Sequence, residues 1–134
     1  MKYDFDSLAR KFSRRFLKVG DVLFREGDTN GDGFIIETGE LVLTRQHQDI
    51  VERAALLNEG EVVGVWKILF NNDSRFFTAV ANRDTSVIVI PEAHLKLLID
   101  QADPFLLHCF RKWLDVSRSH IIEKSSGSSN NMRI

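Results

Sequence analysis

Short apolar runs separated by glycine-bearing turns dominate the middle of the chain, over residues 16–91. They include residues 22–24, 34–36, 41–43 and 87–90. Runs of this length between turn residues are typical of strands. Their close spacing is typical of a sandwich or barrel, so we expect an all-β body here.

The helical period of apolar residues returns after this body and predicts two C-terminal helices within residues 92–124. They meet at Asp103-Pro104, where aspartate can cap a helix and proline suits the first turn. The second helix carries more apolar surface than an isolated terminal helix needs. Its candidate interaction residues are Leu106, Phe110, Trp113 and Leu114. Two interpretations remain open: this helix packs across its own barrel, or it pairs with a second copy.

The two ends of the chain differ in character. Residues 1–15 place Phe5, Leu8 and Phe12 at helical spacing, which predicts a short amphipathic helical segment packed on the body. Residues 125–134 are polar and of low complexity, so we expect a disordered tail.

Composition indicates one globular domain. The 134 residues are 43% hydrophobic and include ten phenylalanines, enough to bury a core without a metal or disulfides. Eighteen Lys and Arg against nineteen Asp and Glu disfavour binding to nucleic acid or an acidic membrane. Cys109 is the only cysteine, which excludes an internal disulfide and favours a reducing, cytoplasmic location. No stretch has the pattern of a signal peptide or a membrane span.

Basic residues are locally concentrated near the N-terminus, at Lys11, Arg14, Arg15 and Lys18. A phosphate contact is one interpretation. The solvated face of a short helix is the preferred one.

Sequence motifs for metal binding and catalysis are lacking. Residues 28–33 open like a calcium-binding loop, but Gly39 stands where that loop requires a bidentate glutamate, so we prefer a glycine-rich hairpin turn. The four histidines lack the spacing of a zinc site. No nucleophile motif, phosphate-loop lysine or carboxylate pair is present. We therefore expect no metal ligands and no catalytic residues, and a protein that is not an enzyme.

Residues 60–80 form the most specific constellation, which we call the cassette. It reads as strand, glycine turn, short helix, loop, arginine and strand. The turn at Gly64 can direct backbone N–H groups and a helix dipole at an anion. Arg75 adds a planar, permanently charged fork suited to phosphate oxygens. The alternative is a surface arginine after an ordinary loop.

Residues 20–28, residues 31–41, the cassette and residues 87–91 together resemble cyclic-nucleotide-binding domains, over about residues 16–124. The resemblance implies an eight-stranded jelly-roll β-barrel with flanking helices and a cassette helix near residues 64–70. It implies cAMP, cGMP or another cyclic nucleotide as the ligand, and C-terminal helices that move when the pocket fills. The ligand-binding positions it implies are Gly64, Val65, Trp66, Arg75 and Phe76.

The cassette departs from the family pattern at several positions. Val65 stands where the family usually has a glutamate that accepts a hydrogen bond from the ribose 2′-hydroxyl. Loss of such a partner costs about 1–3 kcal/mol, or roughly ten- to hundredfold in affinity. Phe76-Phe77 follows Arg75 where smaller residues are usual, and an inward Phe76 would fill space needed by the phosphate. Trp66 and Lys67 add bulk and charge, and we expect Lys67 to be solvated.

Three functional hypotheses follow. The first is a regulatory module with an altered, degenerate pocket, which senses a cyclic nucleotide or related ligand weakly and signals through its C-terminal helix. The second is a ligand-free module for protein interaction or dimerisation, with a protein partner or a homodimer. The third, a DNA-binding regulator, is disfavoured because no helix-turn-helix domain follows the long helix in this chain. We expect no membrane partner.

Overall fold

The computed structural model of the chain describes residues 5–126, and the side chains of residues 5–116. Most of the expected disordered tail, residues 127–134, lies outside the described residues.

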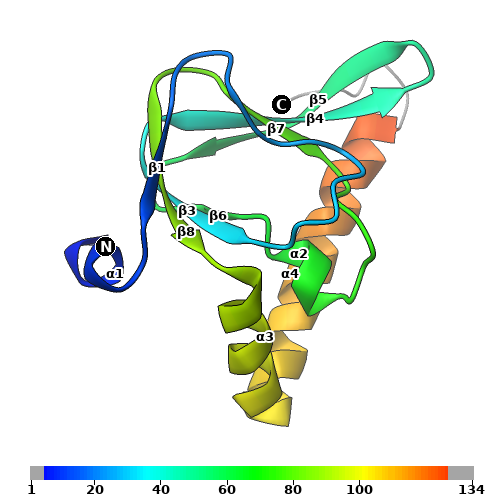
Figure 1. Ribbon diagram of the computed structural model, residues 1–134. Coiled ribbons are helices and arrows are strands. Elements are labelled where there is room, and N and C mark those ends of the chain that lie inside the picture. Colours follow the sequence, from blue (N-terminus) through cyan, green and yellow to red (C-terminus); the bar gives the residue numbers. More distant parts are fainter. Residues whose placement is uncertain (1–4, 127–134) are drawn as a thin grey trace.

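Eight strands form two four-stranded antiparallel sheets that face each other as a jelly roll (Figure 1). The first sheet has the order β1 (Arg14–Leu17), β8 (Thr85–Ile90), β3 (Gly33–Thr38) and β6 (Val62–Val63). The second has the order β2 (Val22–Phe24), β7 (Thr78–Ala81), β4 (Glu40–His47) and β5 (Ile50–Asn58). The expected eight-stranded jelly-roll class is confirmed.

The core lies between the two sheets. Its most completely buried large side chains are Ile36, Leu41, Val87 and Ile88. Residues 85–88 of β8 are buried one after another, and β8 lies between β1 and β3 in its sheet. The apolar runs that predicted strands therefore supply the core.

The loop between β2 and β3 passes from one sheet to the other. β2 pairs with β7, whereas β3 pairs with β6 and β8. The expected hairpin turn at residues 28–33 is therefore wrong, because the two strands that flank it are not neighbours. Among the described residues no group of three His, Cys, Asp or Glu side chains is placed to hold a metal ion.

The N-terminal helix α1 (Phe5–Lys11) ends earlier than expected, and β1 begins at Arg14, before the expected boundary at residue 15. The N-terminal basic residues therefore do not share one helical face, which corrects that prediction. Arg14 makes a two-pronged ion pair with Glu37 of β3, with a shortest distance of 2.7 Å.

Three further helices complete the fold: α2 (Trp66–Leu69), α3 (Glu92–Gln101) and α4 (Pro104–Ser126). The Asp103 carboxylate accepts the Phe105 N–H at 2.9 Å, which confirms the expected cap of α4. Helix α4 turns back from α3 and passes α2 and β5, on the outside of the barrel (Figure 1). No helix within the described residues has the combined length and apolar character needed to span a membrane.

Candidate ligand-binding site

A cavity of about 70 Å³ lies between α2 and the barrel. All five expected ligand-binding residues line it: Gly64, Val65, Trp66, Arg75 and Phe76. The fold thus brings together both ends of the cassette, as the sequence pattern predicted.

Gly64 sets the geometry at the start of α2. Its φ of +89° lies in the left-handed region, which favours glycine. A Cβ at this position would come within 2.8 Å of Arg75 Nη1 and 2.9 Å of the Asp32 carbonyl oxygen. Glycine therefore lets the arginine approach the backbone here.

Helix α2 is a single turn of four residues with no side-chain cap. Few peptide dipoles are aligned in so short a helix, so it contributes little of the dipole expected to attract an anion. The positive charges on the cavity wall are therefore those of the Arg75 and Lys67 side chains.

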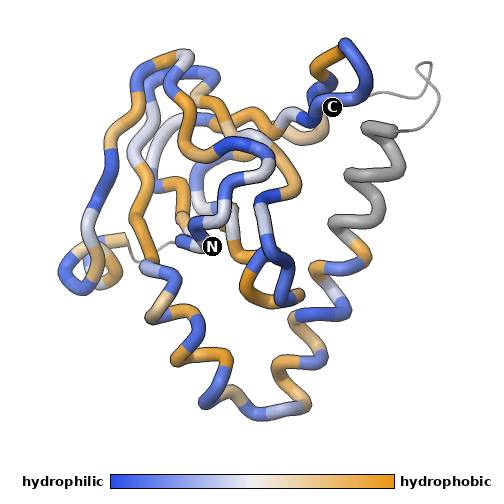
Figure 2. The backbone as a smooth tube through the Cα atoms, turned by 45° about the vertical axis from the view of Figure 1, so that its right-hand side comes forward, coloured by the Kyte–Doolittle hydropathy of each residue, from blue (hydrophilic) through white to orange (hydrophobic). Residues whose placement is uncertain are grey.

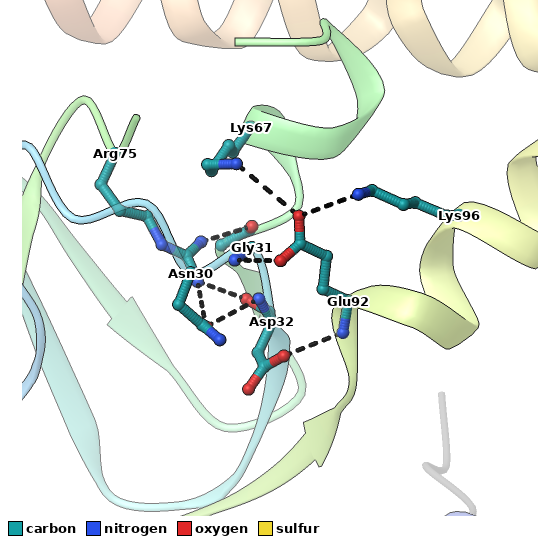
Figure 3. Close-up of polar contacts among 8 residues, drawn as sticks. Asn30, Gly31, Asp32, Lys67, Arg75, Glu92 and Lys96 are labelled. Atoms are coloured by element: carbon teal, nitrogen blue, oxygen red, sulfur yellow. Dashed lines mark hydrogen bonds and ion pairs between the residues drawn. The ribbon is translucent and has the colours of Figure 1, made fainter. Parts of the chain in front are cut away.

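Arg75 is 5% exposed, which rules out the alternative of a surface arginine. Its Nη1 donates to the Gly64 carbonyl and its Nη2 to the Asp32 carbonyl, each at 2.6 Å (Figure 3). The guanidinium also stacks on Phe24, 4.3 Å from the ring centroid. These contacts tie the cassette to the β2–β3 loop.

Arg75 has no direct ion pair among the described residues, although three carboxylates favour its charged form. Burial lowers the pKa of Arg75, and the carboxylates of Asp32, Asp28 and Glu92 oppose that shift from a distance. None of the ion pairs within the described part of the chain involves Arg75. Its Nε is buried without a hydrogen-bond partner. Since arginine stays protonated, the site contains a buried cation with an unused donor.

The two phenylalanines after Arg75 have different environments. Phe77 is 2% exposed and belongs to the core, with Trp66 at 5.5 Å between ring centroids. Phe76 is half-buried at the cavity wall, and Arg45 stacks on its ring at 4.3 Å. Phe77 is therefore the more deeply buried ring, while Phe76 lines the cavity as expected of a ligand-binding position.

A second polar cluster joins the cassette to α3, and we call it the clip (Figure 3). The Glu92 carboxylate accepts the Gly31 N–H at 3.0 Å, while the Glu92 N–H donates to the Asp32 carboxylate at 2.8 Å. Lys67 and Lys96 lie 3.7 Å and 3.5 Å from Glu92 Oε2. The clip consists of these five residues.

The clip changes the interpretation of Lys67. Its side chain is only 10% exposed, so the prediction of a solvated lysine is wrong. The hydrogen bond from Gly31, followed by the two lysine charges, lowers the pKa of Glu92 and keeps it ionised. Sequence reasoning missed Glu92, although an acidic residue in the first turn after Pro91 is a recognisable feature of a helix start.

Helix α4 also contacts the cassette. Arg111 Nε donates to the Leu69 carbonyl at the end of α2, at 2.8 Å. Both C-terminal helices are therefore bonded to the helix that covers the cavity.

The expected interaction residues of α4 are mostly exposed. Leu106, Phe110 and Trp113 are 48%, 43% and 64% exposed, whereas Leu114 is half-buried. Figure 2 shows apolar positions recurring along the outer helices as well as in the barrel. The helix thus packs on its own barrel and still presents an apolar stripe.

The chain belongs to the cyclic nucleotide-binding domain family, whose pattern matches residues 14–102. No curated protein matches it in sequence.

Solved structures share the fold. The cAMP-bound form of an EAL enzyme is 22% identical, with a TM-score of 0.70. The catabolite activator protein of Thermus thermophilus is 25% identical, with a TM-score of 0.67. The c-di-GMP responsive global regulator CLP of Xanthomonas campestris is 18% identical, with a TM-score of 0.71. The matches cover 83%, 86% and 91% of this chain, and 30%, 53% and 61% of those chains.

Proposed function

We propose that this chain is a regulatory, non-catalytic domain with an altered pocket, which binds a small anionic ligand and responds weakly or in a non-standard way to cyclic nucleotides. The observation that carries the proposal is Arg75, a buried cation on the cavity wall with an unpaired Nε–H. An anion would supply the missing acceptor and a direct ion pair.

Two features support weak binding of cyclic nucleotides. Val65 offers no side-chain acceptor for a ribose hydroxyl, at a cost of about 1–3 kcal/mol. The cavity volume, about 70 Å³, is well below the roughly 300–1,000 Å³ typical of small-molecule sites. Inside this cavity a nucleotide would have to displace α2 or the aromatic rings around it, whereas an open hollow of about 350 Å³ adjoins the cavity at Ser74, Arg75 and Phe76.

The contacts of α2 supply a route for the response. Lys67 of α2 pairs with Glu92 of α3, and the carbonyl of Leu69 accepts from Arg111 of α4. A ligand that binds better to one position of α2 therefore biases the positions of both helices, because only differential affinity shifts an equilibrium.

Calorimetric titration with cAMP, cGMP and cyclic di-GMP tests the proposal, with Arg75→Ala and Arg75→Lys as variants. Cys109 is the only cysteine of the chain and lies on α4, so a fluorophore attached there reports on that helix. We expect weak binding of at least one nucleotide, lost in Arg75→Ala, together with a change in the Cys109 signal. If no anionic ligand binds, the sensing function is refuted.

A dimerisation module is the second candidate function. The observation in its favour is the exposed stripe of Leu106, Phe110 and Trp113 on α4. Sedimentation of the free chain tests it: a stable dimer that Phe110→Glu dissociates would support this function, and a monomer at high concentration would oppose it.

A further inference from the structure

The cavity beneath α2 is more apolar than a site built for a sugar phosphate. Of its fourteen lining residues, nine carry apolar side chains, four carry polar or charged ones, and the last is Gly64. Aromatic rings account for four of the nine: Phe24, Trp66, Phe76 and Phe77. Walls of this kind favour a ligand whose body is apolar, because burial of apolar surface is then the main favourable contribution.

Most polar groups of the two charged side chains that line the cavity already have partners within the protein. Lys67 pairs with Glu92, and both terminal nitrogens of Arg75 donate to backbone carbonyls. The guanidinium has five N–H groups, so its positive charge, the unpartnered Nε–H and the second N–H of Nη1 remain for a ligand. A singly charged group with oxygen acceptors matches this charge, and a carboxylate is smaller than a phosphodiester of the same charge.

The volume restricts the size of the ligand. A cavity of about 70 Å³ is roughly half of the 150 Å³ that admits benzene in an engineered apolar cavity. A short aliphatic chain therefore fits with limited movement of the rings, a small aromatic group requires the rings to move further, and a purine with its ribose does not fit.

We propose that the ligand of this cavity is a small carboxylic acid, with a short aliphatic or aromatic body among the rings and its carboxylate against Arg75. The inference rests on the proposed function, in which Arg75 meets the anionic group of the ligand. A carboxylate supplies the acceptor that Nε lacks, and the acid brings no ribose hydroxyl to the side chain of Val65.

Titration of the full chain with matched probes tests the ligand class. The probes are butanoate, hexanoate and benzoate, their alcohols butanol, hexanol and benzyl alcohol, and cAMP and inorganic phosphate. We expect affinity to rise about fourfold for each added methylene group until the cavity is filled. Each acid should bind at least about tenfold more tightly than its alcohol, because a charged hydrogen bond is lost in the alcohol. Equal affinities for acid and alcohol would overturn the carboxylate assignment.

Two matched valines locate the site. Val62 is 53% exposed and lines the cavity, so Val62→Trp blocks it from the surface side without altering the core. Val19 is 65% exposed and does not line the cavity, which makes Val19→Trp the control. We expect Val62→Trp to weaken hexanoate binding at least about tenfold, and Val19→Trp to leave it unchanged. Equal effects of the two substitutions would place the ligand elsewhere and overturn the inference.

The outcomes separate this inference from the proposed function. Binding of cAMP that depends on Arg75, without binding of any acid, would overturn the carboxylic acid and leave the regulatory function standing. Binding of acids with no change at a Cys109 fluorophore would support the ligand class and refute the response of α4. Absence of binding by every probe would overturn both.

Discussion

Replacing Arg75 with methionine removes the guanidinium and keeps an unbranched apolar side chain against Phe24. Two charged hydrogen bonds of 2.6 Å to backbone carbonyls would be lost, each typically contributing about 1.5–3 kcal/mol. Release of the buried charge offsets part of that loss. We expect a net loss of about 3 kcal/mol, a large fraction of the stability of an average domain.

Thermal unfolding of the ligand-free protein measures this loss. For a domain of this size, about 3 kcal/mol corresponds to a fall in Tm of roughly 10 °C. Arg45→Met is the matched control, because Arg45 also stacks on a phenylalanine at 4.3 Å but makes no side-chain hydrogen bond within the described part of the chain. Its Tm should fall by only a few degrees.

Equal Tm values for the two variants would refute the reasoning. The backbone hydrogen bonds of Arg75 would then contribute nothing beyond ring stacking. The result also decides the conditions of the binding experiments, because an unfolded Arg75→Ala protein binds no ligand for a trivial reason.

Three further predictions concern glycines and the clip. The pKa of Glu92 is lowered, so the Glu92 carboxylate stays charged until the pH falls below 4.5, the ordinary pKa of a glutamate. The chemical shift of the Gly31 amide should therefore titrate with a midpoint below pH 4.5 in the wild type. It should not change with pH in Glu92→Gln. A midpoint at or above 4.5 would contradict this. In Gly31→Ala the new Cβ would lie 2.8 Å from both the Glu92 carboxyl carbon and Ile68 Cδ1, so α3 amides should exchange faster while β8 stays protected. Protection of α3 as in the wild type would count against the clip. Gly39 has a φ of +99°, and a Cβ added there would lie 2.5 Å from the Asp84 carbonyl oxygen. Gly39→Ala should therefore lower the free energy of unfolding, measured in urea, by at least about 3 kcal/mol. A loss below about 1 kcal/mol would show that the turn relaxes.

The barrel could be predicted because its strands carry local information. Apolar runs such as residues 22–24 and 87–90 form strands at or near the expected positions. The alternation of inward and outward side chains in β7 also follows the sequence. Ala79 and Ala81 are buried, and the period of two places Phe77 on the same inward face. Phe76 lines the cavity, and Phe77 also belongs to the core.

The errors concern contacts between residues distant in sequence. The β2–β3 loop reads as a hairpin turn, and only the pairing of each strand with a remote partner shows that it joins two sheets. Lys67 was expected in solvent because its partner, Glu92, lies 25 residues later on another helix. Spacing along the chain carries no information about such a pair until the fold is known.

Asp32 has a consequence for the order in which the molecule assembles. Its carbonyl accepts from Arg75 and its carboxylate accepts from Glu92, across separations of 43 and 60 residues. Closing such long loops costs entropy that local pairing does not, so we expect these bonds, like the β1–β8 and β3–β8 pairings, to form later than the β4–β5 hairpin. The same bonds should open before the sheets do in native-state hydrogen exchange. The ligand site is thus held together by contacts between distant segments, which we expect to be lost sooner than the sheets that support them.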